Sequence, residues 1–385
     1  MKPQRNEIII WFDTPPKVSK GAFNYLSQNW GEKVYYVCNE DYPEYRKRVN
    51  WDDGDFGNAD VIYLDNGVDK VNTICALFNE HPNAIHILSG FNNGIEKLVR
   101  QYVLSLSKHL VIFSERPVEI GCILERWARL IFIRIKYSYF YHLYHNRTNV
   151  LLPLGLKGVT TFAKYGWPQK QMMPFMYNPM GGLIDTAFLD SKEKRGAVRF
   201  LYVGRFYYKT KGVDVLMKAV QYLKGQWSLD LVGGYGKKAD EVKLWIESLD
   251  NVSFQGSWPS QEVSHRMSDY DVVIVPSKYD GWNLLVNEAI NAGIGVIVSD
   301  QAVSDEVIKF GHAGTVFRSN KPRELAKAMQ TVIDNPSIIN VWHVNAIATS
   351  RSISPASVGD YLINILDYFV YGIGERPSCP WINHN

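Results

Sequence analysis

The chain has 385 residues, which is more than one ordinary hydrophobic core supports, so we expect two domains. Hydrophobic residues make up 46% and charged residues 21%, a balance that excludes a largely disordered chain. The chain contains 42 Lys and Arg residues and 39 Asp and Glu residues, which gives a net charge of +3. That charge is too small for a protein whose main partner is a nucleic acid.

The cysteines and the apolar stretches exclude further classes. Four cysteines stand far apart and form no C-x-x-C pair, so neither a zinc site nor a disulfide scaffold is predicted. The apolar stretch 8–12 is too short for a signal-peptide core. No stretch reaches the roughly 20 uncharged apolar residues of a membrane span. We therefore expect a cytoplasmic protein, either free or peripheral on the inner face of the plasma membrane.

Short apolar runs alternate with helical patterns along the first half of the chain, which is typical of parallel α/β layers. The predicted strands cover residues 7–12, 34–38, 61–65, 85–89, 110–114 and 149–153, and 157–165 is a predicted helix. The loop-like passage 177–182 and the charged run 190–195 mark a domain boundary.

Between residues 97 and 147 the chain is basic and aromatic, with nine Lys or Arg against three acidic residues. Such a stretch suits the surface of an anionic membrane, or a place beside a lipid-diphosphate acceptor. The alternative is a helix packed on the sheet whose arginines reach out to solvent. The sequence leaves both interpretations open.

The α/β pattern restarts after the boundary. The predicted strands cover 199–203, 228–232, 252–255, 272–276 and 296–299, and a last helix covers 355–370. We predict two tandem doubly wound parallel-sheet, Rossmann-like domains at 1–186 and 187–350, with 351–385 as a C-terminal helix that returns to the first domain. Ligands of such sheets bind beyond the carboxyl ends of the strands.

Two loops at predicted strand ends carry residues that suit phosphate. Gly204 and Arg205 follow one strand, with Lys211 a few residues later, and two cations beside a glycine suit a diphosphate. A glycine-rich turn, Gly233-Gly234-Tyr235-Gly236, follows the next strand. A solvated basic loop and a tight turn without a ligand are the respective alternatives.

The strongest signal is the stretch 276–293, which begins Pro-Ser-Lys-Tyr-Asp-Gly-Trp-Asn. Asp280 lies in the loop after a predicted strand, and Glu288 lies eight residues on, inside the next helix. The first N–H groups of that helix, around 283–285, point into the same space. Because carboxylates suit sugar hydroxyls and helix N–H groups suit phosphate, this pattern favours a nucleotide sugar.

These residues resemble the donor domain of the retaining GT-B glycosyltransferases of family 4. The family hallmark is E-x7-E within P-S-x-x-E-G-F-G-x-x-x-x-E-A-x-x-x-G, and here Asp280, Trp282 and Asn283 replace the first Glu, the Phe and the Gly. The D-G-W form is similar to a branch that builds bacterial surface polysaccharides. The basic loop and the glycine turn match in order, so the resemblance covers about 199–334 and implies two domains facing an interdomain cleft.

The resemblance implies a role for each matching residue. Arg205 and Lys211 would hold the donor diphosphate, Glu288 the ribose and Asp280 the transferred sugar. The rest of the donor site would comprise Gly204, Gly234, Gly256, Gly281, Trp282, Asn283, Leu284 and Leu285. Members also carry a His or a carboxylate near the acceptor, for which His86 and Glu115 are candidates, with Asp13 and Gly21 in the first loop.

The resemblance implies transfer of a hexose or a modified hexose from a UDP- or GDP-linked donor to a saccharide or lipid-linked acceptor, in bacterial O-antigen, capsule or lipopolysaccharide synthesis. We expect no metal and no cofactor, since the acidic turn 52–55 is the nearest candidate metal site and reads more simply as an exposed turn. The alternatives are a sugar-nucleotide epimerase and a binding module without catalysis. A phosphorylase is disfavoured because it needs a pyridoxal lysine and a longer chain.

Overall fold

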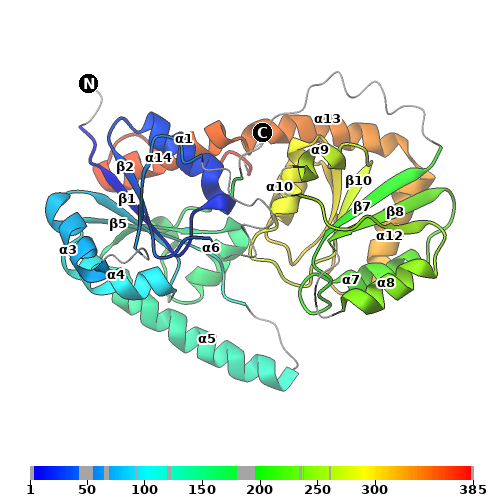
Figure 1. The fold of residues 1–385 in the computed structure, drawn as a ribbon, viewed down its shortest axis with the longest axis horizontal. Helices are drawn as coiled ribbons and strands as arrows, with labels where there is room; N and C mark the ends of the chain where they lie inside the picture. The colour runs from blue at the N-terminus through cyan, green and yellow to red at the C-terminus, as the bar shows by residue number, and fades with distance from the viewer. Residues whose placement is uncertain are drawn as a thin grey trace. The chain divides into compact units, whose positions relative to one another are not determined.

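The computed structural model describes residues 4–42, 55–64, 69–91, 93–118, 123–179, 196–233, 236, 238–259 and 262–382. The chain forms two compact units (Figure 1). The first comprises Met1–Met180 with Pro355–Cys379, and the second comprises Gly181–Ser354 with Pro380–Asn385.

The first unit is built on a parallel sheet with the strand order β3-β2-β1-β4-β5-β6. Its strands are β1 (Ile8–Phe12), β2 (Val34–Cys38), β3 (Asp60–Tyr63), β4 (Ile85–Ser89), β5 (His109–Ser114) and β6 (Thr148–Pro153). The central strand β1 is an uninterrupted apolar run, Ile-Ile-Ile-Trp-Phe, and is buried throughout. Such runs form the centre of parallel sheets because helices cover both faces.

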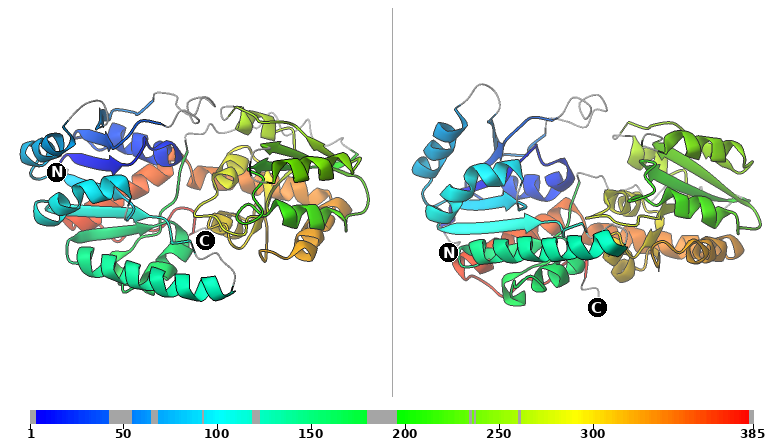
Figure 2. Two further views of the ribbon diagram at one scale, coloured as in Figure 1. Left: turned by 60° about the horizontal axis from the view of Figure 1, so that its bottom comes forward. Right: turned by 90° about the horizontal axis from the view of Figure 1, so that it is seen from below.

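Helices cover the two faces of this sheet (Figures 1 and 2). The helices of the first unit are α1 (Lys20–Asn29), α3 (Lys70–Glu80), α4 (Gly94–Ser105), α5 (Ile123–Tyr144), α6 (Gly155–Ala163) and α14 (Pro355–Tyr371), with short 3₁₀ turns at Lys17–Ser19 and Gln169–Gln171. Helices α1 and α14 pack against each other. Side chains from α3, α4, α5 and α6 join one hydrophobic core with the strands.

The second unit repeats this plan with the strand order β12-β11-β10-β7-β8-β9. Its strands are β7 (Val198–Gly204), β8 (Trp227–Gly233), β9 (Val252–Phe254), β10 (Val272–Val275), β11 (Gly295–Ser299) and β12 (Gly314–Phe317). Its helices are α7 (Val213–Val220), α8 (Ala239–Glu247), α9 (Val263–Met267), α10 (Leu284–Asn291), α11 (Asp305–Gly311), α12 (Pro322–Asp334) and α13 (Ser337–Ser352). Helix α7 packs with α12, and α10 packs with α9 and α13.

Each sheet has one point where the chain reverses the direction in which it adds strands. In the first unit this switch point lies between β1 and β4, and in the second unit between β7 and β10. All the strand pairs at these points are parallel, so their carboxyl ends meet at one edge. Ligands of doubly wound sheets bind there, and each unit has a pocket at that edge, as described next.

Candidate functional site

A pocket of about 230 Å³ opens at the switch point of the second unit. Its walls come from the ends of β7 and β10, the loop that follows β10, and the first residues of α10. The predicted site residues that line it are Lys211, Asp280, Trp282, Asn283, Leu284 and Leu285. Tyr202 and Ser277 also line it and were not predicted.

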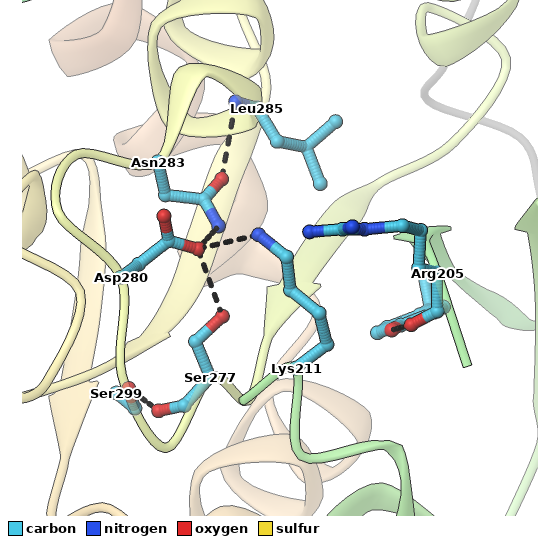
Figure 3. A network of polar contacts seen from close by, with 8 residues as sticks. Arg205, Lys211, Ser277, Asp280, Asn283, Leu285 and Ser299 are labelled. Atoms are coloured by element: carbon cyan, nitrogen blue, oxygen red, sulfur yellow. Dashed lines mark hydrogen bonds and ion pairs between the residues drawn. The ribbon is translucent and has the colours of Figure 1, made fainter. Parts of the chain in front are cut away.

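The carboxylate of Asp280 is the centre of a polar network in this pocket (Figure 3). Its Oδ2 accepts hydrogen bonds from Lys211 Nζ at 2.7 Å, from Asn283 Nδ2 at 2.8 Å and from Ser277 Oγ at 3.4 Å. The side chain is only 12% exposed. None of these three bonds uses Oδ1, so the network orients the carboxylate while leaving one oxygen for a ligand.

The basic loop after β7 is shaped by Gly212. Its φ is +67°, and a Cβ added there would lie 2.0 Å from the carbonyl oxygen of Pro276. Only glycine therefore lets this loop approach the end of β10 so closely. Lys211, the preceding residue, reaches Asp280 as a result.

Arg205 lies on the same loop and is exposed, with its guanidinium 5.1 Å from the ring centroid of Tyr207. Figure 3 shows its side chain pointing toward the ammonium group of Lys211. The loop after β7 thus brings two cations to the carboxyl edge of the sheet, where phosphate oxygens could accept from them. Arg205 does not itself line the pocket.

Tyr202 stays neutral inside the same wall. Burial raises the pKa of its phenol far above the usual value, and the negative charge of Asp280 raises it further. The protonated hydroxyl donates to the carbonyl oxygen of Arg205 at 3.0 Å. Tyr202 carried no signal in the sequence beyond its place in a strand, whereas Ser277 stands in the Pro-Ser pair of the recognised stretch.

The N-terminus of α10 is closed by a side chain. Asn283 has the extended backbone of an N-cap residue, and its Oδ1 accepts from the N–H of Leu285 at 3.1 Å. The resemblance implies that this N–H faces a phosphate, whereas in the structure it donates to Asn283. The N–H of Leu284 takes no part in this bond.

Trp282, in the pocket wall, connects the loop to α10, whereas Gly281 and Glu288 do not line the pocket. Trp282 is buried and donates from Nε1 to Asn287 Oδ1 at 2.8 Å, so it anchors the loop to α10. Gly281, before it, is buried as well. Glu288 is half-buried on α10 and does not line the pocket.

The predicted glycine turn is partly visible. Gly233 has a φ of +123°, and an added Cβ would lie 2.2 Å from the carbonyl oxygen of Gly204. Its N–H donates to the carbonyl oxygen of Gly256, which has a φ of +71°. These glycines allow three strand ends to pack closely, while Gly234 lies outside the described residues.

A larger pocket, of about 710 Å³, lies at the switch point of the first unit. Asp13 and Glu115 line it. Asp13 accepts from the N–H groups of Gly94 at 3.3 Å and Ile95 at 2.6 Å, so it holds the start of α4. Glu115 accepts from the hydroxyl of Tyr177 at 2.8 Å.

His86 and Gly21 do not line this pocket. The ring of His86 is buried and stacks on Phe78 at 4.3 Å, and its Nδ1 accepts from Trp11 Nε1 at 3.1 Å. Burial lowers the pKa of His86 to about 3, so the ring is neutral near neutral pH. The structure therefore places His86 in the core rather than beside a substrate.

Gly21 serves close packing. An added Cβ would lie 2.4 Å from Asn178 Oδ1, and the Gly21 N–H donates to the Asn178 carbonyl oxygen at 2.9 Å. Within the described ranges, no three His, Cys, Asp or Glu side chains gather in a group that could hold a metal ion. None of the helices in that part of the chain combines the length and apolar character of a membrane span.

Comparison with known proteins shows which family part of this chain resembles. Residues 185–348 match the family model described as "Glycosyl transferases group 1". The chain is 26% identical over 228 residues to an uncharacterized glycosyltransferase of Methanocaldococcus jannaschii, which covers 55% of this chain and 57% of that protein. It is 27% identical over 154 residues to the lipopolysaccharide 1,6-galactosyltransferase of Salmonella typhimurium, covering 38% and 42%. The matches thus span about half the length of these relatives.

The solved structures extend the likeness to both units. Anabaena HepE in complex with UDP matches with a TM-score of 0.69 at 14% identity, covering 94% of this chain and 99% of that one. At such low identity the match shows the fold alone. The predicted fold class of two parallel-sheet, Rossmann-like domains of the GT-B type is confirmed. Residues 185–348 are thus similar to the group 1 glycosyltransferases, and the chain as a whole has the two-domain GT-B fold.

Proposed function

We propose that this chain is a glycosyltransferase whose second unit holds a nucleoside diphosphate sugar in the pocket at the ends of β7 and β10. The observation that carries the proposal is the convergence of Lys211, Asp280 and the N-terminus of α10 in that pocket. A cation and helix N–H groups recognise phosphate, and a carboxylate recognises sugar hydroxyls. The family match of residues 185–348 supports the same assignment.

The diphosphate belongs beside the two cations. An ammonium group has three N–H donors, and the bond to Asp280 uses one of those of Lys211. The others can reach a phosphate without breaking the ion pair. As the donor bond breaks, negative charge grows on the leaving diphosphate, and the fixed charges of Lys211 and Arg205 stabilise it where it forms.

The sugar and the ribose belong to the carboxylates. Asp280 would accept from a hydroxyl of the transferred hexose through Oδ1, since its Oδ2 is held by Lys211, Asn283 and Ser277. Its side chain is one methylene shorter than the family glutamate, and the three donors fix its position. Glu288 would accept from the ribose hydroxyls.

The proposed reaction retains the configuration at the anomeric carbon. The bond from that carbon to the diphosphate oxygen breaks, and its electron pair stays with the leaving group. The acceptor hydroxyl oxygen forms the new bond on the same face, and its proton passes to the leaving phosphate oxygen. The two cations and the N–H of Leu284 supply the charge stabilisation, so we propose that no metal ion is required.

We further propose a role in bacterial O-antigen, capsule or lipopolysaccharide assembly on the cytoplasmic face of the membrane, with a saccharide or lipid-linked acceptor. The Salmonella relative, named as a lipopolysaccharide galactosyltransferase, supports this pathway. The donor would be UDP- or GDP-linked, and the complex of HepE with UDP favours UDP.

The test starts with thermal unfolding in the presence of UDP, GDP, CMP and dTDP, since a ligand that binds the folded chain raises its melting temperature. Hexoses linked to the preferred nucleotide are then assayed for nucleoside diphosphate release, with and without EDTA, and the product anomer is determined by NMR. Release that continues in EDTA with a retained anomer supports the proposal. Isomerised sugar without transfer indicates an epimerase, and binding without turnover indicates a binding module.

A further inference from the structure

The pocket of the first unit carries more positive than negative side chains. Four cations line it, namely Lys17, Arg116, Arg129 and Lys136, against the two carboxylates of Asp13 and Glu115. Its volume of about 710 Å³ is large enough for a group much bigger than one sugar ring. The charge of the lining therefore favours an anionic ligand.

Both carboxylates of the pocket are already engaged by donors. Asp13 accepts from the first N–H groups of α4, whose helix dipole offsets its charge. Glu115 accepts from the Tyr177 hydroxyl. Lys136 lies 5.8 Å from the ring centroid of Tyr137, another lining residue, so its ammonium is placed against an aromatic wall. Phosphate oxygens, which only accept, suit a lining with more cations than carboxylates.

One wall of the pocket is α5, which also carries an exposed apolar stripe. Trp127, Ile131, Ile135 and Tyr139 follow one another at intervals of four residues, and each is more than half exposed. Residues at this spacing share one side of a helix. The helix has 22 residues, so it is about 33 Å long. Figure 2 shows it along the outside of the first unit.

The stripe and the pocket meet at Phe132. This side chain is exposed, adjoins the stripe and lines the pocket together with Arg129 and Ile133 of the same helix. A continuous apolar path thus begins inside a cationic pocket and continues along the surface. A large exposed apolar patch on a soluble protein marks a binding surface.

We propose that the pocket of the first unit binds the phosphate or diphosphate head of a lipid acceptor, whose apolar chain lies along the stripe of α5. The proposal rests on the proposed function, since it names the class of acceptor that would receive the sugar. The positive charge selects the head, and the contiguous apolar side chains select the tail. Neither a neutral saccharide nor a free phosphate would use both features.

The test is calorimetric binding of farnesyl diphosphate to the full chain, with farnesol and inorganic pyrophosphate as partial ligands. Saturating UDP is present, so that diphosphate cannot occupy the second pocket, and Lys211→Ala repeats the series with that pocket impaired. We expect farnesyl diphosphate to bind at least about tenfold more tightly than farnesol or pyrophosphate. A charged hydrogen bond, which farnesol lacks, and a buried apolar chain, which pyrophosphate lacks, each contribute at least that factor to the affinity.

Matched variants separate the two features. The double variant Arg129→Gln with Lys136→Gln should bind both farnesyl diphosphate and pyrophosphate about tenfold more weakly, or weaker still. The double variant Ile131→Ser with Ile135→Ser should bind farnesyl diphosphate more weakly but leave the affinity for pyrophosphate unchanged. Arg134→Gln is the control, because Arg134 is an exposed cation of the same helix that does not line the pocket. Melting temperatures check folding, and Lys136→Gln alone serves if a double variant unfolds.

Each remaining outcome decides the matter. Arg134→Gln could weaken the binding of farnesyl diphosphate, or of phosphatidylglycerol vesicles, as much as Arg129→Gln with Lys136→Gln does. That result would indicate a general membrane surface and overturn the pocket assignment. Farnesol or pyrophosphate binding as tightly as farnesyl diphosphate would overturn the amphiphilic ligand. UDP binding without farnesyl diphosphate binding refutes this inference alone, whereas farnesyl diphosphate binding without any nucleotide binding refutes the donor assignment alone.

Discussion

The ion pair between Lys211 and Asp280 allows a quantitative test of the donor pocket. Nζ and Oδ2 are 2.7 Å apart, and the side chains are 24% and 12% exposed. A hydrogen bond to a charged group contributes about 1.5–3 kcal/mol, and partial exposure brings this toward the value of about 1 kcal/mol found for surface pairs. We therefore expect Lys211→Ala and Asp280→Asn each to lower the free energy of unfolding by about 1–2 kcal/mol.

The double variant should lose less than the sum, with a coupling of about 1 kcal/mol, measured by urea denaturation of the four proteins. Nucleoside diphosphate binding gives the second readout. Lys211→Ala should weaken it by about tenfold or more, because a cation is lost. Asp280→Asn should leave it unchanged or tighter, because a negative charge beside the phosphate is removed, while sugar transfer falls. Additive unfolding energies, or equal loss of nucleotide affinity in the two single variants, would refute the reasoning.

Three further predictions follow from the structure. Glu288→Gln should weaken binding of both the free nucleoside diphosphate and the intact donor by about tenfold, as measured by calorimetry. Weaker binding of the donor only would mean that Glu288 contacts the sugar and not the ribose. Gly212 and Gly372 both have a φ of +67°, but an added Cβ would meet an atom within 4 Å only at Gly212. In urea denaturation, Gly372→Ala should lower the free energy of unfolding by about 1 kcal/mol, and Gly212→Ala should lower it clearly more. Equal losses in the two variants would mean that the contact with Pro276 relaxes freely. Burial lowers the pKa of His86 from 6.5 to about 3, so below pH 6.5 the unfolded chain binds a proton that the folded chain does not. Stability should be full above that pH and fall toward pH 3 by up to about 1.4 kcal/mol per unit, and His86→Gln should flatten this slope in urea denaturation at several pH values.

The strands were predictable because most are uninterrupted apolar runs, and each predicted strand appears with its ends shifted by at most two residues. Strand β12 was missed. It is a four-residue strand, Gly-Thr-Val-Phe, at the edge of its sheet, and three of its residues are only half-buried. An edge strand this short has no continuous buried run to distinguish it from a loop.

The meeting of Lys211 and Asp280 was predictable in outline. Both follow strands of one parallel sheet, and β7 and β10 are neighbours, so their carboxyl-end loops lie together. The N-cap bond from Leu285 to Asn283 was not predictable in the same way, because it depends on a side-chain rotamer. Sequence position shows which loop a residue occupies but not which atom its side chain reaches.

His86 shows how a chemically reactive residue type can mislead. Its neighbours on β4 are buried, and the strand lies inside a sheet covered on both faces. The surrounding apolar run was a signal for the core, but the residue type suggested a catalytic role. The stripe on α5 was the opposite case. The sequence shows a basic, aromatic stretch over 97–147, but the exposure of Ile131 and Ile135 between Trp127 and Tyr139 became clear only with the helix in place.

The pairing of α1 with α14 has a consequence for how the chain is made. Gly359 of α14 lies so close to Tyr25 of α1 that an added Cβ would be 2.3 Å from its ring, and Arg5 pairs with Asp367 at 2.7 Å. The first unit therefore needs a helix that the ribosome synthesises after nearly all of the second unit. On a growing chain the main part of the second unit can fold first, while the side of α1 that packs on α14 is still uncovered. Nascent chains stalled before residue 355 should thus expose α1 to chaperones, and release of α14 should end that exposure.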